Sequence, residues 1–341
     1  MHRRQFIRAS HNLLLMLTTT SLIKGCQTQE RSPTLTKAKK SDFQIAMILP
    51  GALSEDPWSQ AGHRGLLLIE KELGAEIAYT EQVVGKDTDI FRRYAEAKYD
   101  LVIGQGGEYA ETAMAVAKEF PRIKFAIFGN HPGNNENYGA LGFKYEEQGY
   151  MLGVMAAIKS RSQKVTIIGG EPLPHMLITS DFFIKGAKSI QPNIQATAKW
   201  INSWTDVAKA EQLAIEAIQA GYDVLVGNVD AGNAKIFQLA EKYGVYGISA
   251  VNDAYDIAPK AVVGSLVQEI PLVLLKGATI VRQGRWEGKQ YRFGFREGIH
   301  TLAPFRGGFT SEQQAQIQSI LQDILTGKID LYSTPTNRKK S

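Results

Sequence analysis

The loop after the first long apolar run carries side chains suited to binding a small polar molecule. The run, Phe43 to Leu49, has the length and composition of a buried strand. The loop 50–58 then supplies a hydroxyl from Ser54, carboxylates from Glu55 and Asp56, and an indole from Trp58. This set can hydrogen-bond to a ligand and stack on it, and it lacks the glycine spacing of a phosphate-binding loop.

A strand–helix–strand unit positions these side chains. Leu66, Ile69 and Leu73 recur at helical spacing, Gly74 ends the helix, and a second strand is expected over 75–80. Two strands joined through a helix pair in parallel by a right-handed crossover. In parallel sheets ligands bind beyond the carboxyl ends of the strands, and loop 50–58 lies at such an end.

Strands and helices continue to alternate along the chain in two series. The first has four strands up to residue 128, with 138–143 expected to lead out of it, and the second opens with a helix over 146–160. No segment of disordered composition separates the series. We therefore predict an α/β fold of two doubly wound lobes joined by hinge strands. Lobe 1 would comprise 43–145 and 267–283, and lobe 2 would comprise 146–266 and 284–332.

The strand-end loops of both lobes are expected to face one cleft. The candidate ligand-binding residues in these loops are Ser54, Glu55, Trp58, Gln105, Gly106, Tyr109, Trp204, Asn228, Asp230, Asn252 and Asp253. We expect Glu55 and Asp253 to act as polar clamps on opposite sides of the cleft. Most of these residue types are also favoured in turns and helix caps, so each could have a purely local structural role instead.

Charge and residue usage exclude several classes of protein. Of the 39 basic and 34 acidic residues, four basic residues and no acids lie in 1–25, so the remainder carries 35 basic residues against 34 acidic ones. A broad basic face for nucleic acid is therefore not expected. The six histidines show no metal-ligand spacing, and no cofactor or metal is expected. A single cysteine excludes an internal disulfide.

The first 26 residues have the pattern of an export signal. A basic start, His2 to Arg8, resembles a twin-arginine signal, and the apolar stretch 13–23 is shorter than the roughly 20 residues of a membrane-spanning helix. Residues 23–26 resemble a lipobox in which Cys26 would be lipidated. The polar segment 27–42 would then tether an exported protein to the cell membrane or hold it in the periplasm. Alternatively, Cys26 stands by chance near a plain cleavage site.

Several short motifs, in order along residues 43–300, resemble the basic membrane lipoprotein (Bmp or PnrA-like) family of substrate-binding proteins. They are Pro50-Gly51, Glu55-x-x-Trp58-x-Gln60-Ala61, Asp100-Leu101-Val102-Ile103-Gly104, Gly169-Gly170, Ser203-Trp204-x-Asp206 and Ala258-Pro259. The resemblance implies a type I periplasmic-binding fold. It also implies a lipid-anchored receptor that presents a small molecule to an ABC permease, with purine nucleosides as the best-known family ligands.

The sequence departs from the family pattern at residues that are expected to contact the ligand. Glu55 stands where the family usually has an aspartate for ribose hydroxyls, and Gln268, a further candidate, stands where a lysine is common. Thr179 replaces a second stacking phenylalanine, whereas Trp58 and Asp253 match residues expected to stack on a base and to bond its edge. A nucleoside and a different small polar ligand both remain open.

Two other classes of function compete with that of a substrate-binding protein. An enzyme could use Glu108 and Glu111 as a carboxylate pair, but acids at a helix N-terminus are favoured by the helix dipole alone. No nucleophile elbow is present, and Gly104-Gln105-Gly106 fits a dinucleotide fingerprint poorly, so no enzyme is expected. A ligand sensor that feeds a membrane signalling partner would use the same cleft and stays open.

Overall fold

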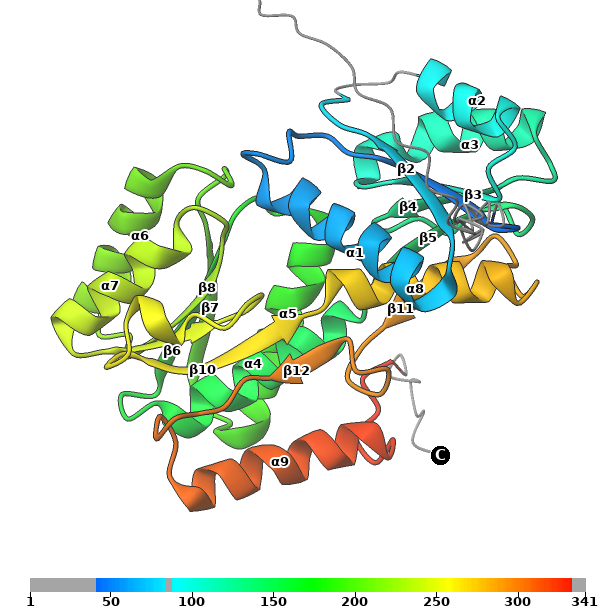
Figure 1. The fold of residues 1–341 in the computed structure, drawn as a ribbon. Helices are drawn as coiled ribbons and strands as arrows, with labels where there is room; N and C mark the ends of the chain where they lie inside the picture. The colour runs from blue at the N-terminus through cyan, green and yellow to red at the C-terminus, as the bar shows by residue number, and fades with distance from the viewer. Residues whose placement is uncertain (1–40, 84–87, 333–341) are drawn as a thin grey trace, which may run out of the picture. The chain divides into compact units, whose positions relative to one another are not determined.

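The computed structural model describes residues 41–83 and 88–332, which fall within one compact unit. Two six-stranded sheets with helices on both faces make up this unit (Figure 1). The predicted export signal, lipobox and most of the tether, Cys26 included, lie outside the described residues. Among the helices described, none has the length and apolar character needed to cross a membrane.

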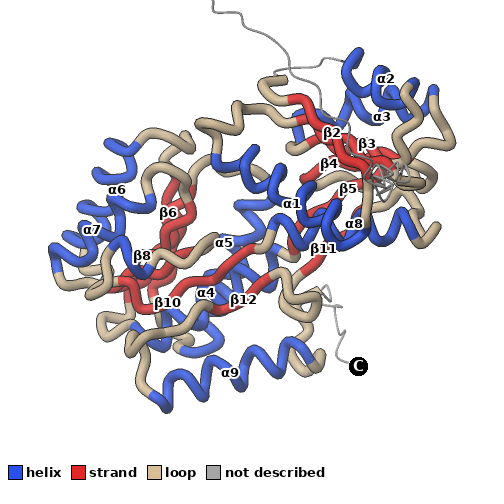
Figure 2. Tube along the Cα trace, viewed as in Figure 1, coloured by secondary structure: helices blue, strands red, loops and turns tan. Residues whose placement is uncertain are grey.

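The first sheet forms lobe 1. Its strands are β1 (Gln44–Ile48), β2 (Glu76–Thr80), β3 (Leu101–Gly104), β4 (Lys124–Phe128), β5 (Tyr138–Phe143) and β11 (Gln290–Phe293). Their order is β11-β5-β4-β3-β1-β2, and every neighbouring pair is parallel. Helices α1 (Pro57–Leu73) and α8 (Ile270–Arg282) cover one face, whereas α2 (Thr88–Glu96), η1 (Gly107–Tyr109) and α3 (Ala110–Glu119) cover the other (Figure 2).

Burial on both faces explains the apolar run that opens the folded part of the chain. Ile45 and Met47 of β1 pack with the α1 and α8 side, while Ala46 and Ile48 pack with the α2 and α3 side. Successive side chains of a strand point to opposite faces, so a strand covered twice must be apolar throughout. Each helix adds one apolar face, which produces the 3–4 spacing of the sequence.

The second sheet forms lobe 2. Its strands are β6 (Lys164–Gly169), β7 (Gln195–Trp200), β8 (Val224–Asn228), β9 (Tyr246–Ser249), β10 (Val262–Gln268) and β12 (His300–Leu302). Their order is β12-β10-β9-β8-β6-β7, and only the β10–β12 pair is antiparallel. The helices are α4 (Tyr145–Lys159), α5 (Pro174–Ile190), α6 (Val207–Gln219), α7 (Asn233–Tyr243), η2 (Tyr255–Ile257) and α9 (Ser311–Leu325).

Glycines bring α4 and α5 into backbone contact. A Cβ atom on Gly149 would stand 2.1 Å from the carbonyl oxygen of Thr179, and one on Gly153 would stand 2.0 Å from that of Phe183. One on Gly186 would stand 2.1 Å from the carbonyl oxygen of Tyr150. Larger residues would push the two helices apart, so α4 and α5 form a close-packed pair that carries the start of lobe 2.

Three crossovers connect the lobes, at 143–145, 268–270 and 293–300. The Lys144 N–H donates to the Phe293 carbonyl at 2.9 Å, which joins the first crossover to the third. The Glu269 N–H donates to the Ile299 carbonyl at 2.9 Å, which joins the second to the third. The predicted α/β fold of two lobes joined by hinge strands is confirmed.

Two segments differ from the sequence-based expectation. Residues 138–143 were expected to lead out of the first series but form β5, an inner strand of the first sheet, directly before the first crossover. The range 284–332 was assigned to lobe 2, yet β11 pairs with β5 of lobe 1. The buried Trp286 anchors this return, because its indole N–H donates to the Asn137 carbonyl at 3.1 Å. The partner of a strand such as β5 or β11 depends on residues far away along the chain, so no local sequence pattern indicates it.

Candidate ligand-binding site

Asp56 fixes the strand-end loop of β1. It caps the N-terminus of α1 by accepting hydrogen bonds from the backbone N–H groups of Trp58 and Ser59, both at 3.1 Å. The Ser59 hydroxyl donates to the same carboxylate at 2.5 Å and accepts from the Gly51 N–H at 3.0 Å. A cap of this kind typically contributes about 1 kcal/mol to stability. The loop is therefore wrapped around a carboxylate held at the carboxyl end of the sheet.

Trp58 is held between the strand-end loops of β1 and β3. Its indole N–H donates to the Gln105 carbonyl at 3.0 Å, and its ring meets Phe128 edge-on with centroids 5.2 Å apart. The ring is half-buried, so part of it remains accessible. Gln105 itself is fully buried, and its Oε1 has no hydrogen-bond partner among the described residues. Gly106 is buried in the same turn.

The candidate residues in the strand-end loops of lobe 2 include Trp204, Asn228 and Asp230. The Trp204 indole lies against Gly170, where a Cβ atom would stand 2.4 Å from the ring. The Ala231 N–H donates to the Trp204 carbonyl at 3.3 Å and so joins the two loops. Asn228 is nearly buried at the end of β8. Asp230, two residues further on, is exposed.

The charge of Asp56, in lobe 1, affects the ionisation of Asp230, in lobe 2. The surrounding protein raises the pKa of Asp230 above its usual value, and the Asp56 carboxylate raises it further. Asp56 follows β1 of lobe 1 and Asp230 follows β8 of lobe 2, so each carboxylate lies just beyond the carboxyl end of a strand in a different lobe. Burial also raises the pKa of Glu108, in the β3 strand-end loop. No described ion pair neutralises Asp56, Glu108 or Asp230.

The remaining predicted residues have other surroundings. Tyr109 is fully buried, and its hydroxyl donates to the Val83 carbonyl at 2.5 Å, so its visible role is in the core of lobe 1. Ser54 and Glu55 are exposed on the turn before α1. Asn252 is exposed and lies 3.4 Å from the Ser249 hydroxyl. Gln268 lies at the second crossover, with its Nε2 buried and without a partner among the described residues.

Asp253 forms an ion pair with Arg306. Its carboxylate accepts hydrogen bonds from Nη1 and Nη2 of Arg306, at 3.1 and 2.6 Å, and this ion pair lowers the pKa of Asp253. Asp253 thus already has a cationic partner and Glu55 is exposed, and the clamp of Glu55 and Asp253 on a ligand stays a prediction. Arg306 lies 53 positions from Asp253, so its pairing could not be read from the sequence.

Sequence analysis missed a pair of rings at the first crossover. Tyr145 and His175 lie 5.1 Å apart between centroids, and Tyr145 lies 6.0 Å from Phe143. Phe143 contacts Phe128, which contacts Trp58, so rings run continuously from the α1 loop to the start of α5. Thr179, one turn after His175, is fully buried and donates to the His175 carbonyl and to Gln148.

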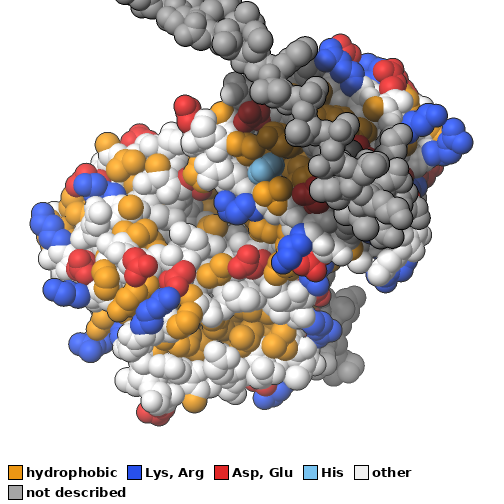
Figure 3. Space-filling model, viewed as in Figure 1, with side chains coloured by type: hydrophobic (Ala, Val, Ile, Leu, Met, Phe, Trp, Pro, Cys, Tyr) orange, Lys and Arg blue, Asp and Glu red, His pale blue; other side chains and the backbone are white. Residues whose placement is uncertain are grey.

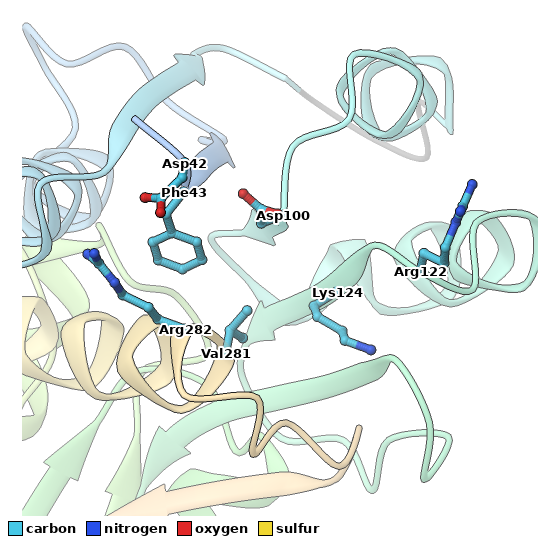
Figure 4. A pocket seen from close by; sticks show the side chains of 7 residues that line it. All are labelled: Asp42, Phe43, Asp100, Arg122, Lys124, Val281 and Arg282. Carbon is cyan, nitrogen blue, oxygen red and sulfur yellow. The ribbon is translucent and has the colours of Figure 1, made fainter. Parts of the chain in front are cut away.

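A separate cavity lies at the opposite, amino end of the first sheet. Asp42 and Asp100 flank Phe43 there, and the Arg282 side chain extends toward the Phe43 ring (Figure 4). The Asp100 carboxylate accepts a hydrogen bond from the Gln44 N–H at 2.7 Å, which fixes the start of β1. Figure 3 shows basic and acidic side chains interspersed over one face, in agreement with the near-balance of charges after residue 25. The carboxyl-end cluster remains the better candidate site.

The chain is similar to a known protein family and to several known proteins. Residues 43–334 match the family model described as "ABC transporter substrate-binding protein PnrA-like". The chain is 26% identical to the transcriptional activator protein med of Bacillus subtilis (91% of this chain, 95% of that protein). It is also 26% identical to a purine-binding protein of Brucella abortus (84% of each).

The solved structures agree on the fold. An ABC transporter solute-binding protein of Aeropyrum pernix superposes with a TM-score of 0.71 at 14% identity, over 87% of this chain and 94% of that one. The two-lobed architecture and the resemblance expected from the sequence motifs are thus confirmed. The chain belongs to the PnrA-like family of ABC transporter substrate-binding proteins.

Proposed function

We propose that the protein binds a purine nucleoside between its lobes and delivers it to an ABC permease. The observation that supports this proposal is the placement of two carboxylates, Asp56 and Asp230, just beyond the carboxyl ends of strands in different lobes, where the charge of Asp56 helps to raise the pKa of Asp230. Two acids that approach each other in a closing cleft need hydrogen-bond donors, because unpaired buried charge is costly. The hydroxyls of a sugar supply such donors without adding negative charge.

The aromatic side chains are suited to stack on the base of such a nucleoside. Trp58 presents a half-buried indole beside Asp56, and Tyr145 and His175 continue the line of rings toward lobe 2. Planar bases stack on such rings. The match to a purine-binding relative favours the same ligand class. Native mass spectrometry of the purified protein tests the proposal: a co-purified purine nucleoside is expected, and a sugar, an amine or an anion in its place would contradict it.

Trp58→Phe should weaken nucleoside binding about fivefold. The phenyl ring keeps part of the stacking area, which is worth roughly 1–3 kcal/mol per base for a full aromatic side chain. The variant also loses the hydrogen bond to the Gln105 carbonyl that orients the ring. Isothermal titration calorimetry gives the dissociation constant. Trp286→Phe is the control, because its indole N–H also donates to a backbone carbonyl, that of Asn137, but at the opposite, amino end of the first sheet. Equal affinity of Trp58→Phe and the parent protein would remove Trp58 from the site.

We further propose that lipidation of Cys26 anchors the protein to the membrane. The support is the position of the sole cysteine at the end of the export pattern. Two acyl chains on one residue make attachment stable, so Cys26→Ala should move the protein from the membrane fraction into a soluble exported pool. Fractionation after a high-salt wash measures this. Retention of Cys26→Ala on the membrane would contradict the anchor.

A ligand sensor is the second candidate function, and the match to a transcriptional activator protein favours it. The same nucleoside would occupy the same cleft, and only the partner would differ. Uptake of labelled nucleoside by cells lacking the protein separates the two functions. Lost uptake supports delivery to a permease, whereas unchanged uptake with altered gene expression supports a signalling partner.

A further inference from the structure

A buried glutamine at the start of lobe 2 bridges two elements of that lobe. Gln148 lies in the first turn of α4, just after the first crossover, and is buried. Its Nε2 donates to the Ala250 carbonyl at 2.8 Å, directly after the end of β9. Its Oε1 accepts a hydrogen bond from the Thr179 hydroxyl of α5 at 3.3 Å. The amide of Gln148 therefore links the carboxyl end of β9 to the beginning of α5.

The partners of this amide determine its orientation. A backbone carbonyl can only accept hydrogen bonds, so the amide nitrogen of Gln148 must face Ala250, and Oε1 must face α5. The Thr179 hydroxyl is shared between Oε1 and the His175 carbonyl one turn earlier, at 3.0 Å. Thr179 is fully buried, so water cannot replace it as the donor to Oε1. Members of such a buried network depend on one another.

On the α5 side, the network holds the turn that carries His175. A Cβ atom on Gly149, the neighbour of Gln148, would stand 2.1 Å from the Thr179 carbonyl oxygen, so the backbones of α4 and α5 touch here. The His175 ring packs against Tyr145, the first residue of α4, with centroids 5.1 Å apart. The position of the His175 ring thus depends on contacts with the first turns of α4.

On the β9 side, the network holds the loop that carries Asn252. Gln148 binds the carbonyl of Ala250, and the next carbonyl, that of Val251, accepts from the Gln268 N–H at 2.9 Å. The exposed Asn252 follows directly. Both Asn252 and Gln268 are candidate ligand-binding residues, so the Gln148 amide supports the backbone beside two of the side chains that could contact a ligand.

We propose that Gln148 and Thr179 are positioning residues for the ligand-binding site, which hold the His175 turn and the loop 250–253 at a fixed separation. The proposal rests on the proposed function, since it concerns the affinity of that site. Both side chains are buried, so they act through the elements that they hold. A binding site needs its contacting groups fixed to within about 0.5 Å by such supporting hydrogen bonds. Nucleoside affinity should therefore depend on the Thr179 hydroxyl.

Calorimetry of the full-length protein with guanosine tests this dependence. Thr179→Val keeps the shape of the side chain but leaves Oε1 of Gln148 without a donor, and it should raise the dissociation constant about 3- to 10-fold, the range for losing one hydrogen bond. Thr179→Ser keeps the hydroxyl and should bind guanosine as the parent protein does. Parental affinity of Thr179→Val, or equally weak binding by Thr179→Ser, would overturn the proposal.

A matched control separates positioning from a general loss of stability. Thr166 of β6 is also fully buried in lobe 2, and its hydroxyl donates to the Thr197 carbonyl at 3.2 Å. Thr166→Val should therefore lose stability in urea unfolding, as Thr179→Val does, yet retain the parental affinity for guanosine. An equal loss of affinity in both valine variants would show that Thr179 acts only through stability and would overturn the proposal.

Amide hydrogen exchange in ligand-free protein gives an independent readout. Gln148→Met fills a similar space without hydrogen bonds, so exchange of the Gln268 N–H, which bonds to the Val251 carbonyl, should become about 3- to 10-fold faster than in Thr166→Val. Equal rates in the two variants would contradict the proposal. If the parent protein does not bind guanosine, the proposed function fails, and the exchange rates still decide whether Gln148 holds this loop.

Discussion

Asp230→Ala should weaken binding of a purine nucleoside about 10- to 150-fold. Asp230 is exposed before ligand binds, yet its pKa is raised by the protein around it and by Asp56. A donor that bridges the two carboxylates would relieve their repulsion, and a hydrogen bond to a charged group contributes about 1.5–3 kcal/mol. Removal of one acceptor forfeits that contribution, which converts to the stated loss of affinity.

Calorimetry of the variant with nucleoside, together with circular dichroism to confirm folding, measures this effect. Asp181→Ala is the matched control, since Asp181 is an exposed acid on α5 of the same lobe. It should bind nucleoside as the parent protein does. If Asp230→Ala also binds with parental affinity, Asp230 lies outside the site and the opposed carboxylates do not define the ligand.

Protonation of His300 should make the protein lose stability as the pH falls from about 6.5 to 4. His300 is 1% exposed between Phe143 and Phe295, and its Nδ1 is buried with no partner among the described residues. Burial lowers the pKa of His300 to about 4. The unfolded chain binds this proton near pH 6.5, so it takes up the proton before the folded protein does. The contribution of neutral His300 to the free energy of unfolding is fully present above pH 6.5, and about 3 kcal/mol of it is lost by pH 4.

Urea unfolding at a series of pH values tests this prediction. His300→Gln keeps a side-chain N–H for the Lys144 carbonyl, with which the imidazole Nε2 interacts at 3.2 Å, but it does not titrate. Its free energy of unfolding should fall less than that of the parent protein between pH 6.5 and 4. Burial also lowers the pKa of His175, so a residual slope is expected in the variant. Parallel curves for the two proteins would show that His300 does not titrate as described.

The alternation of elements could be predicted because it follows from local physics. A strand buried on both faces, such as β1, must be apolar at consecutive positions, and a helix over a sheet must repeat apolar residues at 3–4 spacing. The carboxyl end of such a strand is also set by topology, which placed Trp58 and Asp230 in candidate loops. These features depend on neighbours in the sequence.

The details of the site depend on partners far along the chain. Nothing near Asp253 indicates that Arg306 will neutralise it, and nothing near Tyr109 indicates that its hydroxyl will reach the Val83 carbonyl. Asp56 was recognised as an acid of the first loop, but its opposition to Asp230 requires both lobes to be in place. His175 escaped notice for the same reason, because its ring partner Tyr145 belongs to a crossover.

Comparison of a nucleoside with its 5′-monophosphate tests the central claim most directly. Guanosine and guanosine monophosphate share the base and the ribose, and they differ by a phosphate that would approach the strand-end loops of the proposed site, which carry Asp56, Glu108 and Asp230. Like charges at such sites repel strongly when water is excluded. Calorimetry at one ionic strength should show binding of guanosine and at least about 100-fold weaker binding of the monophosphate. Equal or tighter binding of the monophosphate would contradict the account.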